Sequence, residues 1–187
     1  MKLIKLLLLQ FAVVSLFSCG AGKDENTEVS ALTKEQMEIQ IKDLEVKLYN
    51  DSSKIFNQSV ADSVVKSYTD FVATYPKDEK ASDYLFKAGE ISMSMNRSLQ
   101  AVKCFEQIVD NYPEYERAPY SLFLQAFIYD NQINNDNKAG EIYKAFINKY
   151  PDHAMVKDAE FSIQNLGKSD EELIKEFEAK LSKKGAN

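Results

Sequence analysis

The chain has 187 residues, of which 44% are hydrophobic and 28% are charged; this composition suits one folded domain and excludes disorder as the dominant state. The net charge is −6, which argues against a nucleic-acid partner because a phosphate backbone needs a basic surface. One histidine, His153, and two cysteines, Cys19 and Cys104, are too few for a metal centre built from these ligands, and we expect neither a metal nor a cofactor.

The N-terminus has the pattern of an export signal. Two lysines within residues 1–5 precede the apolar run Leu6–Phe17, and small and polar residues follow it. The run is shorter than the roughly 20 apolar residues that cross a bilayer as a helix. We therefore interpret residues 1–18 as a signal peptide that is removed during export.

Cys19 stands where the apolar run meets the small and polar residues. The segment Leu16-Phe17-Ser18-Cys19 resembles a bacterial lipobox, whose cysteine is thioether-linked to diacylglycerol, although Phe17 replaces the usual small or β-branched residue. We predict lipidation at Cys19; the alternative is an ordinary secretory signal with a fortuitous cysteine. By resemblance to such lipoproteins, Gly20 in place of aspartate favours an outer-membrane anchor facing the periplasm, and Lys23-Asp24-Glu25 resembles a surface-export tag.

Residues 19–33 are small and polar and lack any helical or strand period, which is typical of a flexible tether. We assign residues 34–187 to the folded domain. At its start an apolar residue recurs every three or four positions, at Met37, Ile41, Leu44 and Leu48. This period predicts a helix, either the first half of a repeat that ends at Pro76, which we favour, or a short coiled-coil seam.

The dipeptide Tyr-Pro occurs three times, 37 and 38 residues apart, at Tyr75-Pro76, Tyr112-Pro113 and Tyr150-Pro151. Apolar residues recur five and eight positions before each proline, namely Phe71, Ile108 and Phe146, and Tyr68, Phe105 and Tyr143. These offsets place them on one face of a helix that ends before the proline. Because another amphipathic helix is predicted over residues 81–95 and 118–130, the repeating unit is a helical hairpin. Ser98 and Asp136 are the expected N-caps of its second helix.

The C-terminal part is an incomplete unit followed by a further helix. Its apolar positions Ala159, Phe161, Ile163 and Leu166 stop at Gly167. Ser169 and Glu172 have the spacing of a capping box, which opens a helix that we expect to cover the end of the stack.

These hairpins resemble tetratricopeptide repeats, in particular the slightly long kind of bacterial envelope proteins. The resemblance implies an all-α, right-handed superhelix of about three hairpins with a C-terminal capping pair. Small residues at the helix crossings of the family match Gly89, Ala101, Ala126 and Ala139. The other predicted packing residues are Tyr68, Phe71, Tyr75, Pro76, Phe105, Ile108, Tyr112, Pro113, Tyr143, Phe146, Tyr150 and Pro151.

The resemblance also implies that the first helix of each hairpin lines a concave face that binds a partner. The predicted groove residues are Phe86, Glu90, Tyr120, Phe123, Phe127 and Phe161. The alternative is that these aromatic residues only pack hairpin against hairpin. The lysine and asparagine that clamp a C-terminal carboxylate in some members are replaced here by Phe86 and Glu90, and by Phe123 and Phe127, which disfavours that ligand.

We find no support for catalysis, because His153 lies in a repeat turn and Cys104 beside an anchor position, where both are expected to be structural. We predict a non-catalytic scaffold that binds envelope proteins, similar to the repeat lipoprotein of the β-barrel assembly machinery and to the Tol-Pal-associated periplasmic repeat coordinator. The alternative is an accessory carrier that holds a glycan or lipid in an apolar cavity between hairpins. The sequence leaves the oligomeric state and the partner's identity open.

Replacing Cys19 tests the anchor. The variant Cys19→Ala has no thiol in the lipobox, so incorporation of a fatty-acid analogue should fall to background and an unprocessed or unanchored form should accumulate. Metabolic labelling followed by membrane fractionation measures both, and Cys104→Ala is the control that keeps its label. Undiminished label on the Cys19 variant would contradict lipidation.

Overall fold

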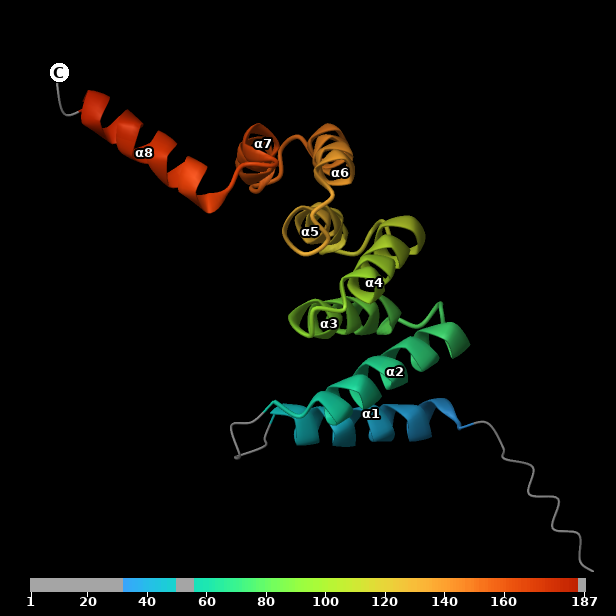
Figure 1. The fold of residues 1–187 in the computed structure, drawn as a ribbon. Helices are drawn as coiled ribbons and strands as arrows, with labels where there is room; N and C mark the ends of the chain where they lie inside the picture. Colours follow the sequence, from blue (N-terminus) through green and yellow to red (C-terminus); the bar gives the residue numbers. More distant parts are fainter. Residues whose placement is uncertain (1–31, 50–55, 185–187) are drawn as a thin grey trace, which may run out of the picture. The chain divides into compact units, whose positions relative to one another are not determined.

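We describe residues 32–49 and 56–184 of a computed structural model (Figure 1). They form α-helices and no strand: α1 (Lys34–Tyr49), α2 (Gln58–Thr74), α3 (Ala81–Ser94), α4 (Ser98–Asn111), α5 (Ala118–Asn131), α6 (Asp136–Lys149), α7 (Val156–Asn165) and α8 (Asp170–Lys184). From α1 to α7, each helix packs against the next. The predicted all-α fold of stacked hairpins is confirmed, with α1–α2, α3–α4 and α5–α6 as its complete units.

The Tyr-Pro dipeptides end the second helix of each hairpin, as predicted. The tyrosine is the C-cap, and its backbone N–H donates to the carbonyl four residues earlier, in α2, α4 and α6 alike. The proline that follows has no N–H and a fixed φ, so the ladder of hydrogen bonds cannot continue. The tyrosines are half-buried and the prolines are exposed.

The second helices begin one residue away from the expected caps. Ser98 and Asp136 are the first residues of α4 and α6, and the residue before each occupies the cap position. Asn135 caps α6 because its side-chain oxygen accepts the backbone N–H of Lys138 at 3.0 Å. The Ser98 hydroxyl instead donates to Oε1 of Gln132 at 2.9 Å, a contact with the next hairpin that the local pattern could not reveal.

α1 is the first half of a hairpin. Ile41 is 2% exposed and belongs to a buried cluster shared with α2 and α3. Met37, Leu44 and Leu48 are partly buried against the same cluster. The repeat interpretation of this segment is therefore confirmed over the coiled-coil alternative.

Most of the predicted packing residues lie in the core. Gly89 is buried, and the fully buried members, each 0% exposed, are Tyr68, Phe71, Ala101, Phe105, Ile108, Ala126, Ala139, Tyr143 and Phe146. They fall into two clusters, one spanning α1 to α5 and one spanning α5 to α7. The stack is thus one continuous succession of packed helices with α5 in both clusters.

α8 begins as predicted but does not cover the stack. The Ser169 N–H donates to Oε2 of Glu172 at 2.9 Å, and the Glu172 N–H donates to Oγ of Ser169 at 3.3 Å, which confirms the capping box. The apolar side chains of α8 are exposed, at 57%, 63% and 58% for Ile174, Phe177 and Leu181. We expected this helix to cover the end of the stack, but these apolar side chains face solvent and do not pack on it.

The calls on the N-terminal region lie outside the described residues. Residues 1–18, Cys19 and the tether up to residue 31 remain predictions, as do the domain boundaries drawn from them. Within residues 32–49 and 56–184, no helix combines the length and the apolar character needed to span a bilayer.

α3 and α4 approach each other closely at Gly89, where a Cβ atom would stand 2.6 Å from Cε1 of Phe105. We expect Gly89→Ala to lower the free energy of unfolding by about 1–3 kcal/mol, as overpacking of a core does, despite the better helix propensity of alanine. The matched control is Gly140→Ala in α6, whose Cβ would meet the flexible end of Leu166 at 3.0 Å and should be tolerated.

Urea unfolding measures both variants. Combining Gly89→Ala with Phe105→Leu should recover part of the loss, since the smaller side chain leaves room for the new methyl group. Wild-type stability of Gly89→Ala would contradict the close crossing of the two helices.

Candidate functional site

Two of the aromatic residues predicted to line a groove are buried between helices of the stack. Phe86 in α3 is 1% exposed, and its ring centroid lies 5.7 Å from that of Phe105 and 6.1 Å from that of Tyr120. Phe123 in α5 is 7% exposed and lies 5.7 Å from Phe146. The half-buried ring of Tyr120 stacks on Phe123 at 6.4 Å and packs against both core clusters.

This arrangement corrects part of the predicted groove. Phe86 and Phe123 offer no ring face to a partner, because their rings are enclosed by aromatic side chains of the adjacent helices. Phe86 packs on Tyr120 of the next hairpin, as the alternative interpretation expected, whereas Phe123 packs within its own hairpin on Tyr143 and Phe146.

Three residues of the predicted groove remain exposed. Glu90 lies in α3 and Phe127, 37% exposed, lies in α5, each nine residues after the first residue of its helix. Because Phe86 and Tyr120 bring α3 beside α5, this shared register places Glu90 and Phe127 on the same side of the stack. Phe161 in α7 is 59% exposed.

Two exposed aromatic residues that the sequence analysis missed lie next to Glu90. Tyr49 and Phe56 are 65% and 58% exposed. They line a hollow of about 300 Å³ together with Leu48, Glu90, Ile91 and Ser94. Tyr49 directly follows Leu48, which lies on the buried apolar stripe of α1, so Tyr49 lies outside that stripe. This position in the sequence could have identified it as an exposed aromatic residue. We call Tyr49, Phe56, Glu90 and Phe127 the Glu90 surface.

The carboxyl group of Glu90 is partly desolvated. Burial raises its pKa above the ordinary value, an effect that Arg117 opposes and Asp83 reinforces. The Arg117 guanidinium lies 4.9 Å from the centre of the Phe86 ring, so this cation is already engaged. A carboxylate in such surroundings attracts a cation from outside more strongly than a fully hydrated one does.

Lys87, one turn before Glu90 in α3, is held in a polar network between α1 and α3. Its ammonium group lies 3.3 Å from Oε1 of Glu45 and 3.2 Å from Oδ2 of Asp83. Glu45 also accepts a hydrogen bond of 2.5 Å from the hydroxyl of Tyr68. Lys87 is therefore occupied by these carboxylates, which leaves Glu90 as an acceptor for other groups.

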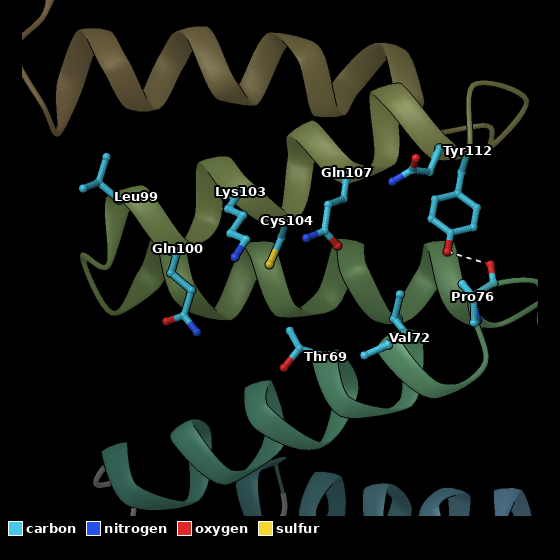
Figure 2. A pocket seen from close by; sticks show the side chains of 11 residues that line it. Thr69, Val72, Pro76, Leu99, Gln100, Lys103, Cys104, Gln107 and Tyr112 are labelled. Carbon is cyan, nitrogen blue, oxygen red and sulfur yellow. Dashed lines mark hydrogen bonds between the residues drawn. The ribbon is translucent and has the colours of Figure 1, made fainter. Parts of the chain in front are cut away.

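A second hollow, of about 820 Å³, lies between α2 and α4 (Figure 2). Tyr112 and Pro76 stand at one end, where the tyrosine hydroxyl donates to the proline carbonyl oxygen at 2.7 Å. Apolar groups of Val72, Ala73 and Leu99 alternate along its lining with polar side chains of Thr69, Gln100, Lys103, Gln107 and Asn111. This mixed lining differs from the apolar cavity expected of a glycan or lipid carrier.

Cys104 lies in the wall of this second hollow but is poorly suited to chemistry. The thiol is 4% exposed, and burial raises its pKa to about 11, so it is protonated at neutral pH and a weak nucleophile. His153 accepts the backbone N–H of Met155 at its Nδ1, at 3.2 Å, and its ring packs against Phe146. Across the described ranges, no group of three His, Cys, Asp or Glu side chains is placed to hold a metal ion.

Residues 83–115 and 120–153 match the profile of the Tetratricopeptide repeat family. These two segments are similar to tetratricopeptide repeats. The matched segments correspond to hairpins α3–α4 and α5–α6, each with its Tyr-Pro dipeptide. Tetratricopeptide repeats generally mediate protein–protein interactions and are typically non-catalytic scaffolds. A search among curated proteins found no significant match to the chain.

Alkylation of Cys104 tests the burial of this thiol in the wall of the second hollow. Because the thiol is buried and its pKa is about 11, iodoacetamide at pH 8 should modify it at least about tenfold more slowly in the folded protein than in urea. The measurement uses a Cys19→Ala background, so that Cys104 is the remaining thiol. Equal rates in the two states would contradict the burial.

The same thiol should make stability depend on alkaline pH. The folded state holds its proton more tightly than the unfolded state, whose thiol has a pKa near 9.0. The free energy of unfolding should therefore be unaffected below pH 9 and fall between pH 9 and 11. Cys104→Ala, as the control, should show a smaller fall over this range.

Proposed function

We propose that this chain is a lipid-anchored, non-catalytic scaffold of the bacterial cell envelope, which binds a protein partner at the Glu90 surface. The observation that carries the proposal is the hollow in which two exposed aromatic side chains, Tyr49 and Phe56, lie beside the partly desolvated carboxyl group of Glu90. Phe127 lies on the same side of the stack by its register. The envelope assignment rests on the export signal and on Cys19, and it places the protein at the outer membrane, facing the periplasm.

The aromatic residues of the Glu90 surface supply apolar area for a complex. Tyr49, Phe56 and Phe127 are 65%, 58% and 37% exposed, and each such side chain buries about 150–250 Å² when fully covered. Binding energy at interfaces concentrates in a few anchors of this kind. We infer that these rings seat apolar side chains of the partner.

The charge of the surface points to a basic partner segment. A lysine or arginine beside Glu90 would pair with its carboxylate, and its charge would also be attracted to the faces of the neighbouring rings. The net charge of −6 would favour the approach of such a segment from a distance. The proposed ligand is therefore a protein segment that combines a lysine or arginine with apolar side chains, on a protein of outer-membrane assembly or of Tol-Pal-linked cell-wall coordination.

Capture of the partner from crosslinked membranes tests this proposal. Phe127→Ser should weaken binding by about 2 kcal/mol, roughly thirtyfold in affinity, as loss of an interface anchor does. Its matched control is Leu99→Ser, which removes an apolar side chain that is 71% exposed on α4 and should leave capture unchanged. Helicity measured by circular dichroism should be the same for both variants.

The charge of Glu90 is tested separately. Glu90→Gln keeps the shape of the side chain and should reduce capture and its salt dependence, whereas Glu106→Gln, at an exposed position of α4, should change neither. Wild-type capture by both folded variants, Phe127→Ser and Glu90→Gln, would refute the Glu90 surface as the binding site.

A further inference from the structure

Each end of the helical stack exposes an apolar stripe. In α8, Ile174, Phe177 and Leu181 step by three and four residues along one face, and they are 57%, 63% and 58% exposed. In α1, Ile39 and Val46 are 62% and 49% exposed and lie seven residues apart, which places them two turns apart on one face.

The stripe of α1 marks the position of a missing neighbour. α3 packs on both α2 and α4, and α5 packs on both α4 and α6, so an internal first helix is covered on two sides. α1 packs on α2 through the side that carries Ile41, and Ile39 and Val46 point about 140–160° away from it at 100° per residue. This is the side on which the second helix of a preceding hairpin would pack.

α8 also has an apolar face that no other described helix covers. It follows α7 in the sequence as a second helix follows a first helix, although α7 and α8 are not among the packed helix pairs. Its apolar residues occupy one face, and Glu172 and Lys175 carry charge elsewhere on its surface. Its stripe is exposed all the same. Among residues 32–49 and 56–184, α8 is thus a second helix whose apolar face lacks a first helix, and α1 is a first helix without a second helix packed before it.

The two ends of one molecule do not reach each other. The connection between α7 and α8, residues 166–169, spans at most about 14 Å when extended. Between α1 and α7 stand five helices in succession, and each packed pair of helices is separated by about 8–10 Å. An α8 helix that lies along α1 therefore has to come from another molecule.

We propose that α8 of one molecule packs its stripe of Ile174, Phe177 and Leu181 on the Ile39 and Val46 face of α1 in a second copy. This contact would continue the packing of second helix on first helix from one chain into the next. It joins two different surfaces, so it is heterologous and builds open chains or closed rings. Because it uses neither Phe127 nor Glu90, it goes beyond the proposed function and can fail independently of it.

Two single variants and their mixture test the proposal by sedimentation velocity of the full chain in detergent. Ile39→Glu disables the face on α1, and Phe177→Glu disables the stripe on α8; both positions are more than half exposed, so the isolated fold should tolerate the charge. The wild-type protein should form assemblies that grow with concentration, and each variant alone should be monomeric. An equimolar mixture should form a dimer and nothing larger, because each variant keeps the surface that the other has lost.

Other outcomes overturn the proposal. If Ile39→Glu alone still forms a dimer and Phe177→Glu does not, α8 pairs with α8 instead of α1. A wild-type protein that is monomeric throughout would show that α8 is covered within its own chain or by a different partner.

A crosslink supplies a measurement that does not depend on the two glutamate variants. In a Cys19→Ala background, Ile39→Cys mixed with Phe177→Cys should form a disulfide-linked dimer under mild oxidation, whereas Leu99→Cys, on the exposed side of α4, should not crosslink to Phe177→Cys. Absence of the first crosslink in a folded mixture that still assembles would place the interface elsewhere.

Discussion

The packing of Tyr120 between Phe86 and Phe123 is the contact on which the arrangement of the hairpins depends. It joins the cluster that spans α1 to α5 to the cluster that spans α5 to α7. The rings of Phe86 and Phe123 in this contact are buried and unavailable to a ligand. The proposed partner-binding surface therefore uses the exposed neighbours of these rings, Glu90 and Phe127.

The junction between the first two hairpins combines aromatic packing, with the Tyr68 and Tyr84 ring centroids 5.0 Å apart, with a set of ion pairs. α1 is tied to α3 and to the turn before it by ion pairs, with Lys34 on Asp78, Lys80 on Glu38 at 2.8 Å and Lys87 on Glu45 at 3.3 Å. Such partly exposed pairs contribute little each, about 0–1 kcal/mol, whereas the aromatic joint removes large apolar surfaces from water. The polar junction orients α1 beside Glu90 and leaves Tyr49 exposed at the edge of the proposed binding surface.

A repeat fold leaves binding surfaces of two kinds. Each hairpin buries its apolar faces only on its neighbours, so the sides of the stack can vary while the packing residues stay the same. The ends are different, because in the part of the chain that the structure describes α1 and α8 each have an apolar stripe that no other helix covers. Here α1 and α8 carry exposed apolar stripes at those ends. The proposed surface for a protein partner therefore lies on the side of the stack, and the proposed surface for further copies of the chain lies at its ends.

Local chemistry in the sequence determined the helices: the Tyr-Pro dipeptides end α2, α4 and α6 because proline cannot continue a helix, and the spacing of apolar residues marked the buried faces and the capping box of α8. It also indicated hairpins that repeat every 37 or 38 residues. Only the tertiary structure decided which aromatic residues are core and which are surface. Phe86 and Phe127 both lie on first helices and both were placed in the groove, yet they are 1% and 37% exposed. The difference arises because Phe105, Tyr115 and Tyr120 enclose Phe86, and these rings come from positions 19 to 34 residues further along the chain, a distance over which helical periodicity carries no information.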